Sequence, residues 1–419
     1  MKISQELSNT IVDPAAYADF DQIHEAFTEI RKNTPVALVE AEGFDPFWLI
    51  SKFEDVQHVE KSSDLFHAGD RMTVLTEAQT IRNTIEEIGT PFRLMTLINM
   101  DPPRHTVLRD LTADWFGPRS LRNLEPRIRQ RAQQTLKTFE EIGGECDFAK
   151  DIALYYPLRV IMDILGVPDE GEEFMLKMTQ DMFSASDEDM MGYKSKEERD
   201  AAMAKATMDA FAYFNDINES RRKNPQDDLA SVFANGKIDG EYMTDLETIG
   251  YYVITATAGH DTTSNSTSAG MWALCQQPEM LSQLKENPDL IAAFVEESIR
   301  WETPVKHFMR SATQDSELRG ISLKEGDWMM SSFASACRDE DVYDNPFEFD
   351  ITRKPNRHLA LGYGVHVCLG QHLARLEMRI LWEELIKRLK SVEMTGPMTR
   401  VAASFVSGPK SLPIRFTLH

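Results

Sequence analysis

The sequence is poor in cysteine and in positive charge. Its 419 residues include only 4 cysteines, and 45 lysines and arginines stand against 68 aspartates and glutamates, which gives a net charge of -23. The cysteines are too far apart for a CxxC zinc site or an iron–sulfur cluster motif. The excess of acids argues against binding to nucleic acid or to an anionic membrane surface.

Long apolar runs and a secretion signal are also missing. The best apolar stretch, residues 251–258, is too short to cross a bilayer. The first residues lack the basic head and apolar core of a signal peptide. So few cysteines in a chain of this length suit a reducing compartment. We therefore expect a cytoplasmic protein without a membrane anchor.

Helical periodicity dominates the middle of the chain. Apolar residues recur three and four apart in residues 121–139, 172–183, 200–223, 243–276 and 290–301. Strand-like patterns occur only near the two ends of the chain and around residue 320.

We predict a mostly α protein with a small β subdomain, folded as one domain over residues 1–419. The helical body spans about 100–310 and 368–390. The β portion comes from about 35–60, 315–335 and 400–419. One continuous domain is expected because strands near residues 40, 320 and 415 would have to pair with one another.

A short glycine-containing loop leads to a single cysteine. Gly362 and Gly364 permit backbone conformations with positive φ. Cys368 then precedes a long amphipathic helix, whose N-terminus favours a thiolate. Gly370 would let a flat ligand lie close to that helix, and His366 could donate to an anionic group on the ligand. Together these residues predict a metal-bound thiolate beneath a planar cofactor.

This loop resembles the haem-binding signature of the cytochrome P450 superfamily, FxxGxxxCxG. The resemblance implies haem b (iron protoporphyrin IX) as the cofactor and Cys368 as the axial ligand of its iron. The family has an aromatic residue seven positions before the cysteine, where this chain has Leu361. That difference affects the packing of the loop and the potential of the iron, while the expected ligation is unchanged.

A second segment, residues 258–263, carries a carboxylate beside a hydroxyl. Ala258 and Gly259 remove side-chain bulk, and Thr262 can hydrogen-bond back to a carbonyl one turn earlier. Asp261 beside Thr262 offers a proton path into an apolar cavity. The segment resembles the family's oxygen-activating motif, [A/G]Gx[D/E]T, which implies relay roles for Asp261 and Thr262 and space for O2 beside Ala258 and Gly259.

Glu297 and Arg300 lie three residues apart on a predicted helix, and the pair matches the family's ExxR motif. The resemblance implies that Arg353 joins them in a buried ion-pair network. That role is structural.

His105 and Arg109 are four residues apart and so share one face of a helix. The family uses such a pair to hold the haem propionates, and Arg310 and His366 match two further propionate contacts. Arginine suits this task physically because it binds carboxylates with two hydrogen bonds.

The resemblance runs essentially from end to end and is strongest to the bacterial subfamily that includes the α-terpineol hydroxylase. It implies the cytochrome P450 fold and the insertion of one atom of O2 into a C–H bond. The implied substrate is a small hydrophobic molecule, either a monoterpenoid such as α-terpineol or an alkyl-aromatic. It also implies electrons from an iron–sulfur ferredoxin with an NAD(P)H-dependent ferredoxin reductase, because no flavin domain is fused. We further expect a monomer.

Phe183, Phe308 and Phe405 are candidates for the wall of the substrate pocket. The stretch 175–208 is rich in methionine, whose flexible thioether adapts to apolar guests. Ordinary packing of these methionines is the alternative interpretation.

Positive charge is concentrated in two segments that, by the resemblance, lie on the face nearest the iron. The arginines are Arg119, Arg122, Arg127, Arg129, Arg131, Arg375 and Arg379. They predict a docking surface for an acidic ferredoxin. The alternative is a pair of solvated helix faces neutralised by local acids such as Glu125 and Glu377.

Two alternative functions stay open. The same fold could serve a thiolate-haem peroxygenase or isomerase, although an intact acid–alcohol pair argues against this. The chain could instead be a non-catalytic haem sensor or carrier, but a sensor would normally need an output domain, and none is visible.

Overall fold

The structure is a computed structural model that describes residues 1–184, 186–193 and 195–419. Helices dominate it, which confirms the predicted fold class. The α-helices are α1 (Gln5–Val12), α2 (Pro14–Ala18), α3 (Phe20–Asn33), α4 (Phe53–Lys61), α5 (Ala78–Ile88), α6 (Arg104–Ala113), α7 (Pro118–Ile142), α8 (Tyr155–Leu165), α9 (Glu172–Phe183), α10 (Glu188–Met191), α11 (Lys196–Lys223), α12 (Leu229–Asn235), α13 (Asp245–Ala258), α14 (Asp261–Gln276), α15 (Pro278–Glu286), α16 (Ile291–Glu302), α17 (Phe333–Ala336) and α18 (Gln371–Arg388). Within the described residues, no helix is both long and apolar enough to span a membrane.

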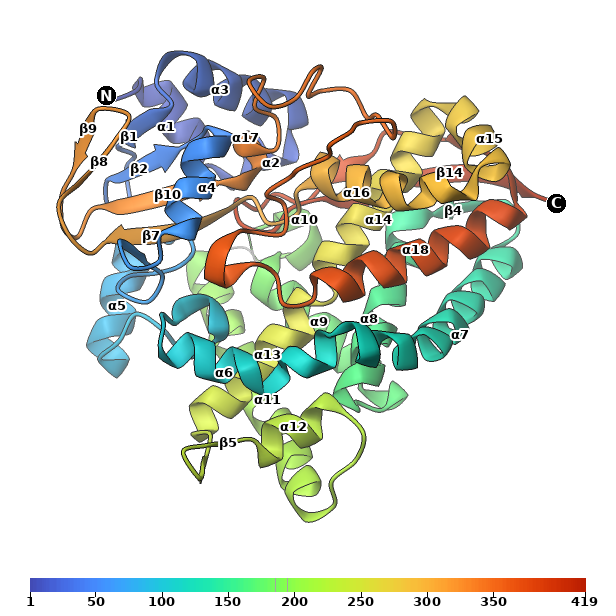
Figure 1. The fold of residues 1–419 in the computed structure, drawn as a ribbon, viewed down its shortest axis with the longest axis horizontal. Coiled ribbons are helices and arrows are strands. Elements are labelled where there is room, and N and C mark those ends of the chain that lie inside the picture. The colour runs from blue at the N-terminus through green and yellow to red at the C-terminus, as the bar shows by residue number, and fades with distance from the viewer. Residues whose placement is uncertain (185, 194) are drawn as a thin grey trace.

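The strands are short and belong to several small sheets. They are β1 (Val36–Val39), β2 (Phe47–Ile50), β3 (Phe66–His67), β4 (Glu145–Asp147), β5 (Lys237–Ile238), β6 (Glu241–Tyr242), β7 (His307–Ala312), β8 (Ser316–Leu318), β9 (Ile321–Leu323), β10 (Trp328–Ser332), β11 (Leu389–Met394), β12 (Thr399–Arg400), β13 (Pro409–Ser411) and β14 (Pro413–Leu418). The largest sheet has the order β1-β2-β10-β7-β3 and lies at one end of the molecule, beside α1 and α3 (Figure 1). In this sheet β10 runs parallel to β2 and antiparallel to β7.

The pairing of the C-terminal strand differs from our prediction. We expected strands near residues 40, 320 and 415 to pair, but β14 belongs to a separate sheet of order β11-β14-β4. Residues 316–323 form their own hairpin, β8–β9. The physical reason lies in packing: Phe416 of β14 stacks on Phe139 of α7, with ring centroids 3.8 Å apart, and this holds β14 on the helical body.

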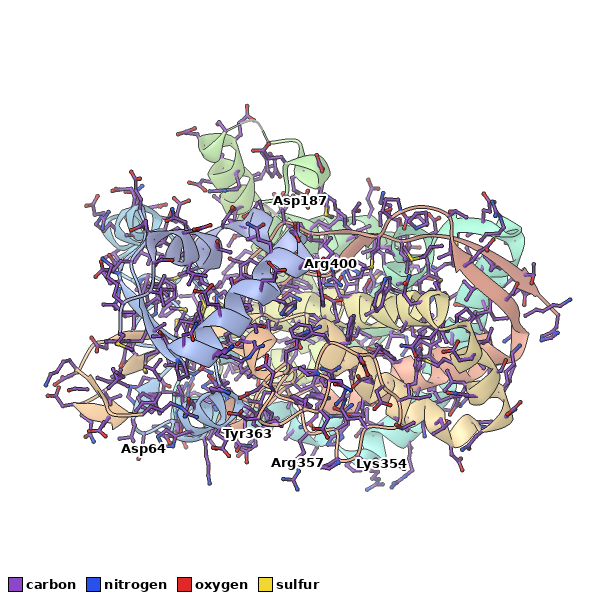
Figure 2. All side chains as sticks on the ribbon, turned by 90° about the horizontal axis from the view of Figure 1, so that it is seen from above. Asp64, Asp187, Lys354, Arg357, Tyr363 and Arg400 are labelled. Atoms are coloured by element: carbon purple, nitrogen blue, oxygen red, sulfur yellow. The ribbon has the colours of Figure 1, made fainter. Side chains whose placement is uncertain are left out.

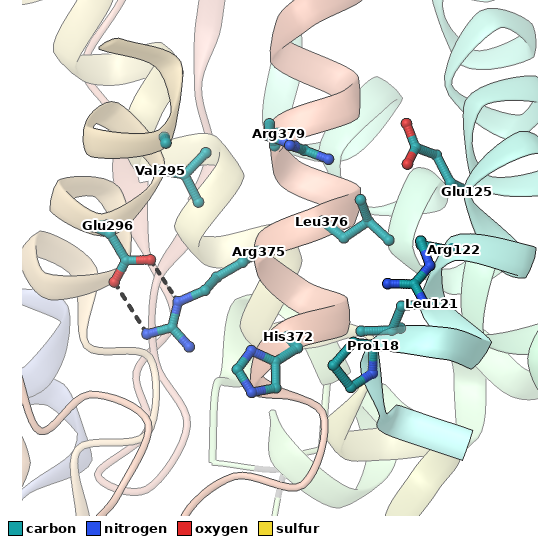
Figure 3. Close-up of a pocket in the computed structure, with 11 residues that line it drawn as sticks. Pro118, Leu121, Arg122, Glu125, Val295, Glu296, His372, Arg375, Leu376 and Arg379 are labelled. Atoms are coloured by element: carbon teal, nitrogen blue, oxygen red, sulfur yellow. Dashed lines mark hydrogen bonds and ion pairs between the residues drawn. The ribbon is translucent and has the colours of Figure 1, made fainter. Parts of the chain in front are cut away.

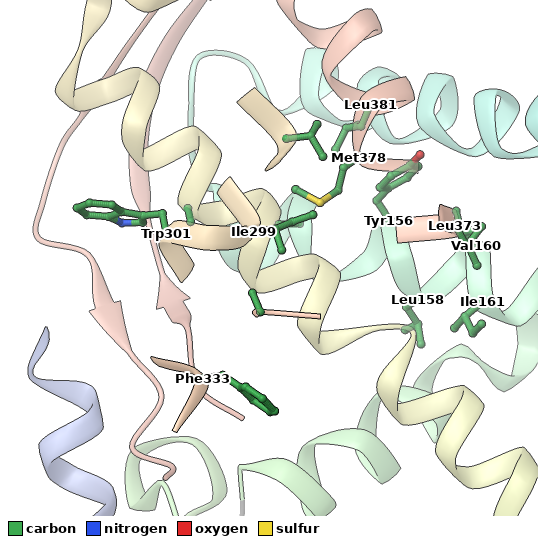
Figure 4. Close-up of a cluster of buried hydrophobic side chains, with 14 of the residues drawn as sticks. Tyr156, Leu158, Val160, Ile161, Ile299, Trp301, Phe333, Leu373, Met378 and Leu381 are labelled. Carbon is green, nitrogen blue, oxygen red and sulfur yellow. The ribbon is translucent and has the colours of Figure 1, made fainter. Parts of the chain in front are cut away.

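The helices that carry the site pack against one another through apolar side chains. Figure 4 shows Ile161 of α8, Ile299 of α16 and Met378 of α18 in one cluster around the central helices. The same buried cluster includes Val36 near the start of the chain and Phe416 near its end. A single domain over residues 1–419 therefore remains our interpretation.

Candidate active site

One cavity brings together most of the predicted site residues. This central cavity lies between the loop before α18, the junction of α13 and α14, and the start of α6. The predicted residues that line it are His105, Arg109, Ala258, Gly259, Thr262, Phe308, His366, Cys368 and Gly370. The other predicted residues do not line this cavity.

The cysteine loop is shaped by close backbone contacts. Gly362 and Gly364 have φ angles of 72° and 68°, as predicted for glycine. A Cβ on Gly364 would lie 2.1 Å from the Glu60 carbonyl oxygen, so only glycine fits there. The N–H of Cys368 donates to the carbonyl of Leu361 at 2.8 Å. Because this bond uses the backbone of Leu361, the loop closes without the family's aromatic side chain.

Burial affects the pKa of the Cys368 thiol more strongly than the neighbouring helix does. Burial raises the pKa of the thiol, while the N–H of Gly370 and the charges of Arg109 and Arg375 lower it. Our expectation that the helix N-terminus would favour a thiolate is therefore too simple. A bound cation would be needed to hold the sulfur in its thiolate form.

Unpaired histidine nitrogens gather in the wall of the central cavity. Both ring nitrogens of His105 and Nε2 of His366 are buried without a hydrogen-bond partner in the described residues. The two rings lie 4.4 Å apart, and Arg109 Nη2 donates to the Val367 carbonyl at 2.6 Å. Burial and nearby arginines lower the pKa of His105 to about 4 and that of His366 to about 2. The charge of Arg109, together with neutral rings that can each donate one N–H, suits carboxylates.

Arg310 was predicted in this group, but the structure places it in an ion pair. Its Nη2 lies 2.5 Å from Glu60 Oε2, and both side chains are buried. Arg310 does not line the central cavity. Its charge still contributes to the lowered pKa of His366. Glu60 is 250 residues away along the chain, so no local pattern indicates this pairing.

The predicted helix over residues 243–276 is interrupted at the site. Helix α13 ends at Ala258 and α14 begins at Asp261. Thr262 Oγ1 donates to the Ala258 carbonyl at 2.9 Å, as predicted, and so replaces a backbone bond at the interruption. A Cβ on Gly259 would lie 2.9 Å from the side chain of Ile161, so this glycine also allows α8 to pack closely.

The acid and the alcohol of this motif face different spaces. Thr262 lines the central cavity, whereas Asp261 lines a separate polar cleft, in which Phe183, Asn265 and Lys410 also lie. Asp261 Oδ1 is 3.3 Å from Nδ1 of the buried His260. Burial raises the pKa of Asp261 above its ordinary value, and His260 opposes that shift.

The structure brings the three residues of the predicted ion-pair network together. Arg300 binds Glu297 through two hydrogen bonds of 2.7 Å, and both side chains are fully buried. Arg353 Nε lies 3.6 Å from Glu297 Oε2. Glu297 also accepts from the N–H of Asp350 at 2.9 Å and from Asn356 Nδ2 at 3.0 Å. The carboxylate therefore joins α16 to the loop that precedes the cysteine.

The three predicted phenylalanines form a chain of ring contacts. Phe405 lies 5.4 Å from Phe308 and 6.0 Å from Phe183, between ring centroids. Only Phe308 lines the central cavity, while Phe183 lines the polar cleft. Apolar wall residues that the sequence reasoning missed include Ile254 and Phe333.

The methionines of residues 175–208 pack as ordinary core and surface residues. Met175 and Met178 are buried in the core, and Met203 and Met208 are exposed. None of the described methionines in this stretch lines the central cavity.

Glu377 is a buried carboxylate that the sequence reasoning misplaced. The alternative interpretation of the basic segments counted it among the acids of a solvated helix face, but Glu377 is 2% exposed and lines the central cavity. Burial raises its pKa well above the ordinary value, and a hydrogen bond from Thr263 opposes this. Charged residues recur along α18, so no sequence signal separated Glu377 from its exposed neighbours.

A match to a known protein family identifies the family of this chain. The family model described as Cytochrome P450 matches residues 17–414. The chain belongs to the cytochrome P450 family.

Its relatives cover nearly the whole chain. Cytochrome P450-terp of a Pseudomonas species is 45% identical over 421 residues, which cover 99% of this chain and 98% of the relative. A steroid C26-monooxygenase of Rhodococcus jostii is 34% identical and covers 96% of this chain and 84% of the relative. The crystal structure of CYP108D1 from Novosphingobium aromaticivorans matches with a TM-score of 0.93 at 40% identity, over 100% of both chains. The chain is therefore a P450 monooxygenase of the bacterial type.

The P450 family implies a haem–thiolate cofactor, and the residues of the central cavity fit one. The position of a Cβ on Gly370 has no atom within 4 Å, which leaves open space beside the loop. The unpaired ring nitrogens of His105 and His366 lie in the wall of the same cavity. A flat apolar group with carboxylates at one edge matches this combination.

The arginines of the expected docking face of this P450 are mostly neutralised. Figure 3 shows a groove between α7, α16 and α18, in which Arg375 binds Glu296. The other pairs join Arg127 and Arg131 to Asp163, and Arg129 to Glu125, Glu383 and Glu384. Arg379 lies 3.6 Å from Glu383. In the described part of the chain, no acid pairs with the exposed Arg119 or Arg122, so the predicted patch reduces to these two.

Proposed function

We propose that this P450 hydroxylates a small hydrophobic molecule with O2, and that the substrate is a monoterpenoid such as α-terpineol or an alkyl-aromatic. The observation that carries the proposal is the composition of the central cavity. Its wall combines Cys368 and the polar side chains His105, Arg109 and His366 with the hydroxyl of Thr262 and the apolar side chains of Ile254 and Phe308. The 45% identity to Cytochrome P450-terp supports a terpenoid.

In this proposal the sulfur of Cys368 would bind the iron of haem b, and His105, Arg109 and His366 would hold its propionates. When bound, the haem–thiolate group supplies the redox chemistry that inserts one atom of O2 into a C–H bond. Arg310 would act through its charge, since its guanidinium is engaged by Glu60.

The chain's own residues bind substrate and control protons. Phe308, Phe333 and Ile254 present apolar surface that binds a hydrocarbon and excludes water. Thr262 holds a hydroxyl in the cavity, oriented by the Ala258 carbonyl. Asp261, on the side of the polar cleft, has access to solvent protons. Proton transfer by positioned groups of this kind typically contributes about 10²–10⁴-fold to a rate.

The proposed function is tested by binding and turnover with the haem-loaded protein. Terpenoids and alkyl-benzenes are screened for a substrate-induced change of the iron spin state, and then for product formation with NAD(P)H, a ferredoxin and its reductase. A hydroxylated product that requires NAD(P)H supports the proposal. Turnover with peroxide alone would indicate a peroxygenase, and binding without NAD(P)H oxidation would indicate a sensor or carrier.

Replacement of Thr262 is expected to separate oxygen reduction from product formation. Thr262→Ala should bind substrate and consume NAD(P)H at nearly wild-type levels, because the hydroxyl is bonded to the Ala258 carbonyl and adds little to the apolar wall. Peroxide should rise severalfold at the expense of product, since the proton donor in the cavity is no longer oriented. Thr262→Ser, which keeps the hydroxyl, is the control. Unchanged product per NAD(P)H in Thr262→Ala would show that the proton arrives by another route.

Electrons are proposed to come from an iron–sulfur ferredoxin that docks at the groove of Figure 3. Arg119 and Arg122 are the two arginines of α7 without an acidic partner among the described residues, and Arg122 lines the groove. Attraction between such exposed charges is screened over about 8 Å at physiological salt. The first reduction should therefore slow as ionic strength rises.

Reversal of these two arginines should weaken this docking. Arg119→Glu with Arg122→Glu should slow reduction at low salt and limiting ferredoxin about tenfold, mainly through the association rate. Substrate affinity should not change. The control reverses Lys205 and Lys223, two exposed lysines of α11, which alters the net charge equally. Equal reduction rates in both double variants would place the docking surface elsewhere.

A further inference from the structure

At the interruption between α13 and α14, neighbouring residues line the central cavity and the polar cleft. The cleft is lined by residues between 149 and 155 and by α9, α10, α14 and the C-terminal strands, and Asp261 lies in its wall. Thr262, the next residue, lines the central cavity. Two consecutive side chains thus line two different spaces, a cleft with many polar wall residues and a mainly apolar cavity.

His260 lies at this interruption with a fully buried ring. Its Nε2 is 2.8 Å from the Leu154 carbonyl oxygen. A carbonyl oxygen only accepts, so Nε2 carries a hydrogen in every protonation state of this arrangement. In the neutral ring, Nδ1 is then an acceptor without a hydrogen.

Asp261 faces this second nitrogen. Its Oδ1 lies 3.3 Å from His260 Nδ1, and Nδ1 has no hydrogen-bond partner among the described residues. A carboxylate oxygen and a bare ring nitrogen are both acceptors, and burying them against each other is costly. One proton on the pair replaces the repulsion between two acceptors by attraction between a cationic ring and a carboxylate.

We infer that His260 and Asp261 share one exchangeable proton, which Asp261 passes toward Thr262 and which solvent in the polar cleft replaces. Each proton that leaves the Nδ1–Oδ1 pair is restored by one from water, so the pair returns to its one-proton state. His260 is a positioning residue, because it acts through Asp261. This inference rests on the proposed function, which creates the demand for protons in the central cavity.

The other charged groups of the cleft are held by partners of their own. Asp187, labelled in Figure 2, binds Lys410 with both carboxylate oxygens at 3.0 Å, and Asp189 adds a contact of 3.1 Å. Lys150 lies 3.4 Å from Asp147. The remaining titratable side chains in the cleft wall are Asp151 and Tyr155.

The protonation of Asp261 agrees with a shared proton. Burial raises the pKa of the Asp261 carboxyl, and the charge of a protonated His260 lowers it.

The pair itself is tested without turnover, by NMR of protein labelled with ¹⁵N-histidine, as apoprotein and as the ferrous–CO holoprotein. The signal of His260 is assigned from its loss in His260→Gln. Nε2 should stay protonated throughout, and Nδ1 should titrate with a midpoint that moves in Asp261→Asn. The inference would be overturned by a ring protonated only on Nδ1, or by a titration midpoint that is the same in Asp261→Asn as in the wild type.

Two variants then test the role in proton delivery. In His260→Gln the amide can still donate to Leu154, but nothing titratable faces Asp261. In His260→Asn the amide reaches toward Asp261, but the bond to Leu154 is lost. In the wild type the rate of product formation should fall at high pH. We expect this fall to begin about 1 pH unit lower in both variants, so that at a given pH in this range their rate is about tenfold lower. Substrate-induced spin shifts and, in His260→Gln, thermal stability should be unchanged.

A defect confined to His260→Asn would mean that the histidine acts only by holding Leu154, and it would overturn the inference. Wild-type pH profiles in both variants would do the same. A wild-type protein that oxidises none of the screened substrates contradicts the proposed function, whereas the NMR titration decides the shared proton independently.

Discussion

Cys368→Ser should abolish the thiolate-type Soret band of the ferrous–CO complex. Serine has nearly the shape of cysteine, and the N–H of residue 368 can still donate to the Leu361 carbonyl, so the loop should remain closed. A hydroxyl does not ionise as readily as a thiol, so the variant has no thiolate to bind the iron. The shape of the cavity should not change. The measurement is the spectrum of the reduced protein under carbon monoxide, together with its haem content.

The other three cysteines provide the controls. Cys146 and Cys275 are partly buried and Cys337 is fully buried, and none of them lines the central cavity. Serine at each of these positions should leave the band in place, although Cys337→Ser should lose some stability because it puts a hydroxyl in the core. Retention of the band in Cys368→Ser would contradict the ligand assignment and much of the proposed function.

Motifs whose chemistry is local could be predicted well from the sequence. The glycine conformations around Cys368 follow from the need for positive φ, and the bond from Thr262 to the Ala258 carbonyl follows from their spacing of one helical turn. The pairing of Glu297 with Arg300 follows from a separation of three residues on one helix. Each of these contacts spans only a few residues.

Relations that depend on tertiary structure could not be predicted in this way. Successive residues of a helix point about 100° apart, so Asp261 and Thr262 face different spaces despite being neighbours. The ion pair of Arg310 with Glu60 and the neutralisation of Arg127 and Arg131 by Asp163 join separate elements. Charge counting along the sequence therefore overstated the basic patch.

Glu297→Ala should strongly destabilise the protein and impair its loading with haem. The carboxylate is fully buried and accepts four hydrogen bonds, two of them from Arg300. Its removal leaves Arg300 and Arg353 without this opposite charge, and an uncompensated buried charge typically costs about 3–5 kcal/mol. Because Glu297 ties α16 to the segment before the cysteine loop, we expect poor haem incorporation and not peroxide release.

The control removes an exposed acid of the same type. Glu141 lies 3.7 Å from Lys137, one turn away on α7, with side chains 67% and 74% exposed. Glu141→Ala should change the free energy of unfolding by no more than about 0.5 kcal/mol, since exposed helical pairs contribute little. Urea unfolding and the ratio of haem to protein measure both effects. A Glu297→Ala protein with wild-type haem content and stability would show that Arg300 finds other partners, and the network would then not be needed to support the loop that carries Cys368.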